Sequence, residues 1–175
     1  MKAQGKLMDM LTGYAASHQH PFNVFVHMIG IPTIMLGVMI PLTWVTIGIN
    51  QFYFSLAHVL ILGFFIFYAT LDIVFAVVFL VAGYFLEMLA AKLGDVPGNA
   101  AWIIAAACFF GGYAAQFIGH AVEKSMPVLV KHPVQANLAA PFFTVVELFK
   151  IVGLRDELFE AVQAEIRDRR EHEAG

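Results

Sequence analysis

The sequence predicts an all-α polytopic membrane protein, a single membrane domain with four transmembrane helices. Of its 175 residues, 60% are hydrophobic and only 13% are charged, whereas soluble domains usually contain about 45–50% apolar and about 25% charged residues. Positions 10–71 and 96–122 contain no Asp, Glu, Lys or Arg. Both stretches are longer than the roughly 20 apolar residues that suffice to cross the hydrocarbon core of a bilayer. The chain therefore needs a lipid bilayer as its solvent.

Composition also argues against several classes of protein. Lys and Arg number 10 against 13 acidic residues, which gives a net charge of -3, so no basic surface for nucleic acid is expected. A single cysteine, Cys108, excludes an intrachain disulfide and a thiolate metal cage. Lys2, Lys6 and Asp9 precede any apolar core, so we expect no cleavable signal peptide.

Residues 3–18 are predicted to form a short amphipathic helix. Apolar positions recur there at helical spacing and make one stripe. The stripe consists of Leu7, Leu11, Tyr14, Ala15 and His18. His18 is therefore expected to face inward. Pro21 has no N–H to donate and is best tolerated in a first turn, so a new helix should begin near it.

The four expected spans pair as two helical hairpins. The predicted spans are residues 24–49, 52–71, 73–91 and 100–122. Pro32 and Pro41 should kink the first span, since each removes one backbone hydrogen bond. Asn50 and Gln51 leave room only for a tight turn before the second span. The turn-forming residues 97–99 connect the third span to the fourth.

The C-terminal part of the chain is expected to remain at the membrane surface. The apolar segment 138–152 is short for a span, so an interfacial or re-entrant segment is predicted there. Residues 154–170 should form a surface helix with an apolar i+4 stripe, made of Leu154, Leu158, Val162 and Ile166.

Four spans place both termini on one side of the membrane. That side carries several cations, whereas the opposite loops offer only Lys92, so the positive-inside rule predicts cytoplasmic termini. The membrane is either a bacterial cytoplasmic membrane or the endoplasmic reticulum. The cations on the terminal side are Lys2, Lys6, Lys124, Lys131, Lys150 and Arg155.

Two groups of polar side chains recur at helical spacing in this apolar chain, where ionisable residues are costly to place. In the first group, Asn23 and His27 are one turn apart, and His20 comes seven residues before His27. The second group, spaced i, i+4 and i+7, consists of Gln116, His120 and Glu123. Both groups fall on the same side of the membrane.

This shared location predicts one metal site built from both groups. Imidazoles with a carboxylate suit Fe(II), Zn or Cu, and the lack of cysteine ligands makes a structural zinc site the less attractive choice. A metal site at the membrane surface that is covered by apolar residues suggests a lipid substrate.

Other interpretations of the histidines remain open at this point. A lone buried histidine such as His58 is more often a packing residue, and His132 and His172 are expected to be solvated. Two histidines on facing helices, His27 or His58 with His120, would suit a haem carrier. The polar residues would only hold helices together in a small transporter or scaffold. A di-iron desaturase is disfavoured because the chain has no HxxHH motif.

Two stretches resemble the motifs of a membrane family that includes the yeast 2-hydroxy fatty acid dioxygenase. The first stretch has its motif residues at Tyr14, His18, Asn23, His27 and Pro32. The second contains Gln116, Gly119, His120, Glu123 and Pro127, followed by residues 139–147. The similarity covers most of residues 10–152.

The resemblance implies an Fe(II)-dependent enzyme that uses O2 to shorten a long-chain 2-hydroxy fatty acid by one carbon, which is fatty acid alpha-oxidation. It implies that His18, His27 and His120 hold Fe(II), with open coordination positions for substrate and O2. His20 is a fourth candidate ligand, by spacing and not by resemblance. The candidates for hydrogen bonds around the metal site are Asn23, Gln116 and Glu123.

Overall fold

The computed structural model describes residues 2–174, and the side chains of these except residues 2–4, 49, 131, 170, 173 and 174. Lys2 and Lys131, two of the cations on which the prediction of cytoplasmic termini rests, lie outside the described side chains. The elements in chain order are α1 (Lys2–Ala15), α2 (Pro21–Thr43), β1 (Thr46–Ile49), β2 (Phe52–Ser55), α3 (Leu56–Ala69), α4 (Ile73–Gly94), α5 (Ala100–Glu123), α6 (Val128–Lys131), α7 (Pro133–Ile151) and α8 (Asp156–Ala174).

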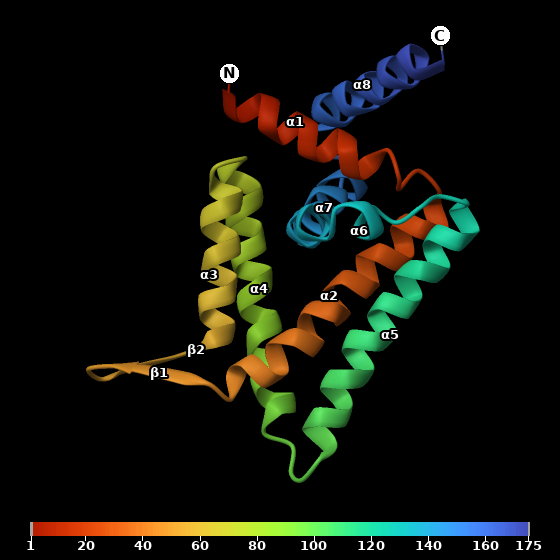
Figure 1. Ribbon diagram of the computed structural model, residues 1–175. Coiled ribbons are helices and arrows are strands. Elements are labelled where there is room, and N and C mark those ends of the chain that lie inside the picture. Colours follow the sequence, from red (N-terminus) through yellow and green to blue (C-terminus); the bar gives the residue numbers. More distant parts are fainter. Residues whose placement is uncertain (1, 175) are drawn as a thin grey trace.

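Helices α2 to α5 run between the two ends of the molecule. Figure 1 shows both termini at one end together with α1 and α8, and the β1–β2 hairpin and the α4–α5 turn toward the other end. The all-α membrane architecture is thus confirmed. Within the described residues, four helices are long and apolar enough to cross a membrane, namely α2, α4, α5 and α7.

The set of spanning helices differs from the expected one. The predicted span 52–71 contains only the 14-residue α3, and the helix in place of the predicted span 24–49 runs from Pro21 to Thr43. Segment 138–152 belongs to a 19-residue helix, α7. Figure 1 nevertheless shows α7 lying across the bundle at the end that carries the termini.

A β hairpin takes the place of the expected helix ends. β1 pairs antiparallel with β2 from Thr46 opposite Ser55 to Ile49 opposite Phe52. Most of these residues are β-branched or aromatic and favour strands. Asn50 makes the tight turn with a φ of 56°, a left-handed conformation that asparagine tolerates better than most residues.

The helices do not pair as the two expected hairpins. α2 packs along α5, and α3 packs along α4. Glycines permit the close approach of α2 and α5, since a Cβ on Gly37 would lie 2.6 Å from Phe109 N, and one on Gly112 would lie 2.9 Å from Gly30 O. Small residues at helix contacts are typical of membrane proteins, because they let backbones approach each other.

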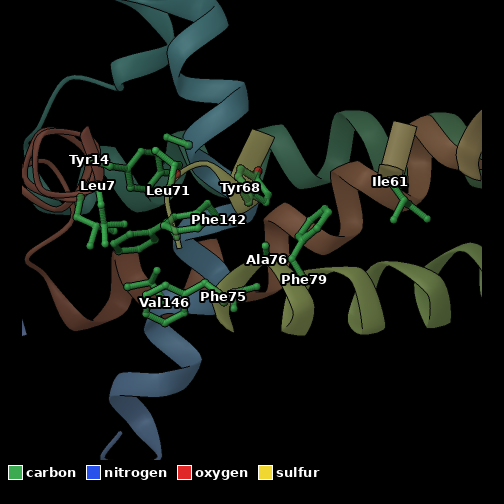
Figure 2. Close-up of a cluster of buried hydrophobic side chains, with 14 of the residues drawn as sticks. Leu7, Tyr14, Ile61, Tyr68, Leu71, Phe75, Ala76, Phe79, Phe142 and Val146 are labelled. Atoms are coloured by element: carbon green, nitrogen blue, oxygen red, sulfur yellow. The ribbon is translucent and has the colours of Figure 1, made fainter. Parts of the chain in front are cut away.

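The buried core lies between α3, α4, α7 and the amphipathic α1. Figure 2 shows Tyr68, Phe75 and Phe142 packed at its centre, and all three are fully buried. Tyr68 also donates a hydrogen bond to Leu138 O over 2.8 Å, which ties α3 to α7. The apolar stripe predicted on α1 is buried in full.

The C-terminal helix packs on α1 and begins later than predicted. α8 starts at Asp156, so Leu154 lies outside it and is exposed, whereas Val162 and Ile166 are buried. An ion pair between Arg155 and Asp72 ties the start of this segment to α4.

We expect two Gly→Ala substitutions to have opposite effects. At Gly37 the new methyl group meets the backbone of α5, so the free energy of unfolding should fall by about 1–3 kcal/mol. At Gly111, on α5, nothing lies within 4 Å of a Cβ, so better helix propensity should raise it by up to about 1 kcal/mol. Thermal unfolding in detergent, followed by circular dichroism, measures both. Equal effects would contradict the close packing of α2 on α5.

Candidate metal centre

Three histidines from separate segments meet at the end of the molecule that carries the termini. His18 lies in the link between α1 and α2, His27 in the second turn of α2, and His120 in the last turn of α5. Their ring centroids are 4.4 Å (His18–His27), 4.8 Å (His18–His120) and 5.0 Å (His27–His120) apart. One ligand nitrogen from each lies within 4.8 Å of the others. All three are at most 4% exposed.

The hydrogen bonds of these rings fix which nitrogen is free. His18 Nδ1 lies 2.7 Å from Tyr14 O, and His27 Nδ1 lies 2.9 Å from Asn23 O. A carbonyl oxygen only accepts, so each Nδ1 carries a proton, and in the neutral imidazole each Nε2 then keeps its lone pair. His18 Nε2 is buried with no hydrogen-bond partner among the described residues. Such a pattern is typical of a metal-binding histidine, whose other nitrogen donates to a carbonyl or carboxylate.

Ser125, which was not among the residues predicted from the sequence, orients the third histidine. His120 Nδ1 lies 2.9 Å from Ser125 Oγ, and this hydroxyl donates to Ser17 O at 3.4 Å. Ser125 thus accepts from Nδ1–H and leaves Nε2 of His120 free as well. The signal available in the sequence was a serine shortly after the end of the last predicted span. Its return toward His120 depends on Lys124, which has a φ of 57° and closes α5.

Burial keeps His18 uncharged. Loss of solvation, reinforced by the nearby His27, lowers the pKa of His18 to about 3, so the imidazole is neutral at pH 7 and its lone pair is available. Tyr14 stacks on the His18 ring at 4.1 Å with an interplanar angle of 2°. Burial raises the pKa of Tyr14, so the phenol stays neutral too.

Asn23 and Glu123 link the segments that carry the histidines. Asn23 Nδ2 donates to Glu123 Oε2, while Gln19 N donates to Glu123 Oε1 over 2.8 Å. Both carboxylate oxygens are therefore engaged with the start of α2 and the link before it. Gly119 allows this contact, because a Cβ there would overlap Asn23 Oδ1.

The other sequence candidates lie in different places. His20 is exposed, and its Nδ1 accepts from Phe22 N at the start of α2, so it is not part of the histidine cluster. Gln116 is half-buried, one helical turn before His120. His58 contacts Ser55 and Glu87 instead. His132 and His172 are exposed, as predicted.

A cavity of about 180 Å³ begins at the three histidines. Along α2 it extends from His27 to Val38, a rise of about 16 Å at 1.5 Å per residue. Its polar lining besides the histidines is limited to Tyr14, Tyr113, Gln116 and Asn137. The apolar lining is Ile31, Ile34, Met35, Val38, Leu60, Phe64, Phe117, Pro127, Val128, Leu129, Ala136, Ala140 and Pro141. The cavity therefore suits a long apolar molecule whose polar end meets the histidines.

Comparisons with known proteins identify a family that resembles this chain. The model of a family described as 2-hydroxy-palmitic acid dioxygenase Mpo1-like matches residues 5–151. The chain is 35% identical over 147 residues to the 2-hydroxy-palmitic acid dioxygenase MPO1 of Saccharomyces cerevisiae, a match that covers 83% of this chain and 81% of the yeast protein. No solved structure matches the present chain. With the family model matching most of its length, this chain belongs to the Mpo1-like family.

Proposed function

We propose that the protein is an Fe(II)- and O2-dependent dioxygenase that shortens long-chain 2-hydroxy fatty acids by one carbon. The observation that carries this proposal is the buried cluster of three histidines at the end of an elongated apolar cavity. The name of the yeast relative supplies the reaction class and the kind of substrate.

His18, His27 and His120 would hold the iron. Imidazole ligands suit iron, zinc, copper and nickel alike, so the dioxygenase name of the relative is what favours iron. Three protein ligands leave positions open, as catalytic metal sites require. Bound Fe(II) would supply the redox chemistry that lets O2 react with an organic substrate.

The residues around the cluster have separate tasks in this proposal. The acyl chain lies in the apolar cavity, which brings the carboxylate and the 2-hydroxyl group to the histidines. Gln116, half-buried in the cavity one turn from His120, provides an amide that hydrogen-bonds the polar end of the substrate. Asn23 and Glu123 hold the start of α2 against α5, so that His27 faces His120.

Two alternative functions fit the geometry less well. The ring of His18 contacts the rings of both His27 and His120, which leaves no space for a flat haem between the latter two. A structural role in a transporter or scaffold does not explain the unpartnered His18 Nε2, because buried polar atoms that hold helices together are normally hydrogen-bonded.

We place the histidine cluster at the cytoplasmic boundary of the membrane. Lys6, Lys124, Lys150 and Arg155 belong to the segments at the end with both termini, whereas Lys92 lies near the opposite end. By the positive-inside rule, the end with more cations faces the cytoplasm. The bilayer is that of the endoplasmic reticulum or of a bacterial cell.

Removing one histidine ligand should abolish both metal binding and turnover. We expect wild-type protein loaded anaerobically with Fe(II) to retain about one iron per chain, as three convergent imidazoles predict, and His120→Ala to retain almost none. Metal analysis followed by O2 uptake with 2-hydroxypalmitate measures both properties. His20→Ala is the matched control and should behave like wild type. A wild-type protein without iron or uptake would overturn the proposal.

Removing the hydroxyl group of Ser125 should weaken iron binding while leaving the ligands in place. Without its acceptor, the His120 ring loses its fixed orientation, and affinity for Fe(II) should fall about 10–100-fold. Competition with a chelator of known affinity measures the change in Ser125→Ala, and Ser125→Thr should restore most of it. Equal affinity in wild type and Ser125→Ala would show that Ser125 does not orient His120.

Filling the far end of the cavity should change the preferred chain length. Val38→Phe shortens the apolar cavity, so we expect the ratio of kcat/KM for a long over a short 2-hydroxy acid to fall by about 10-fold or more. Val77→Phe, exposed on α4, is the control and should leave the ratio unchanged. If Val38→Phe also leaves it unchanged, the acyl chain does not lie in this cavity.

A further inference from the structure

The β1–β2 hairpin exposes an apolar surface far from the histidine cluster. It projects sideways from the helices, in the half of the molecule opposite the termini (Figure 1). Residues 44–55 contain no charged side chain. Phe52 is 69% and Tyr53 75% exposed, among the largest values for bulky side chains in the described chain. The hairpin thus covers little of the core and presents its aromatic residues outward.

Polar contacts hold both ends of the hairpin on α4. Just before β1, Trp44 Nε1 donates to Gly94 O over 3.1 Å. At the end of β2, Ser55 Oγ donates to Glu87 Oε1 over 3.2 Å. These two contacts fix the direction in which the hairpin leaves the helices.

The length of α3 indicates where the hairpin lies relative to the bilayer. The 14 residues of α3 cover about 21 Å at 1.5 Å per residue, less than the roughly 30 Å of a hydrocarbon core. Its first residue follows the hairpin directly, so α3 is too short to carry the hairpin beyond the far side of the bilayer into open water.

Neighbouring polar groups exclude a deeper position. His58 and Glu87 lie beside the base of the hairpin, and ionisable groups avoid the hydrocarbon centre. The outer edges of a two-stranded hairpin also carry unpaired backbone N–H and C=O groups, which hydrocarbon cannot satisfy. Water and lipid headgroups at the interface can.

We propose that the hairpin lies in the headgroup interface of the leaflet opposite the termini and sets the depth of the helices in the bilayer. Its partner is the lipid surface, contacted through Phe52, Tyr53 and Phe54. Aromatic side chains are enriched at this level of the membrane, and Trp102, 60% exposed and in ring contact with Trp44, extends the same aromatic surface onto α5. Because the hairpin is uncharged, the contact requires no anionic lipid.

A nitroxide label at position 53 tests the proposal without requiring metal or activity. The label is placed on Tyr53→Cys in a Cys108→Ala background, in phosphatidylcholine vesicles, and its collisions with O2 and with a water-soluble nickel chelate give its depth. We expect a depth at the headgroup boundary. Phe110→Cys, 69% exposed in the middle of α5, is the control and should report the hydrocarbon centre.

Three results would overturn the proposal. A label at 53 that collides freely with the nickel chelate lies in water. A label as deep as that at 110 lies in hydrocarbon. Dipolar broadening between labels at 53 shows that the hairpin pairs with a second copy of the chain.

The effect of the hairpin on the depth of the helices is measured separately. Changing Phe52 and Tyr53 together to Ser should shift the depth of the label at 110 by an amount measurable in the same experiment. An unchanged depth at 110 would overturn this claim.

Discussion

The close approach of α2 and α5 is the contact on which the histidine cluster depends. Gly30 and Gly37 on α2 meet Gly112 and the backbone near Phe109 on α5. His27 precedes Gly30 by three residues, so any separation of the two helices moves it away from His120. Because the glycines lack side chains, the two helices pack closely, and this close packing sets the distance between His27 and His120.

The histidine cluster is a place where folding leaves polar atoms unsatisfied. His18 Nε2 is buried without a partner in the described structure, and an unmet buried polar group costs about 1–3 kcal/mol. Stacking by Tyr14 and the hydrogen bond from Nδ1 hold the ring in that position. Under the proposed function, the bound ion would remove this cost, so metal binding and stability of the link between α1 and α2 would be coupled.

Hydropathy and helical spacing are local properties, so the amino-acid sequence predicted the membrane class, the amphipathic α1 and the association of His27 with His120. Spacing suggested His20 as their partner, whereas the resemblance to the family supplied His18, the histidine that the structure places in the cluster. The pairing of α2 with α5 was not predicted. It depends on Gly30 and Gly37, which are seven residues apart on α2, and on Gly112 on α5. The hairpin at 46–55 was assigned to helices because hydropathy alone does not separate short apolar strands from helix ends. Ser125 reaches His120 only through the left-handed turn at Lys124, which the residue types did not signal.

The arrangement along α2 relates the proposed substrate to the bilayer. This helix carries His27 near one membrane boundary and cavity residues such as Ile34 and Val38 in its middle. Trp44 follows its last residue at the other end, beside the hairpin. A fatty acid in a leaflet likewise has its carboxylate at the boundary and its chain in hydrocarbon. Moving it into the cavity exchanges one apolar environment for another, while its polar end stays at the boundary level. Binding therefore draws little on the hydrophobic effect. Discrimination between a 2-hydroxy acid and other lipids must then come from the polar groups at the histidine end of the cavity, while the depth of the apolar part limits the chain length.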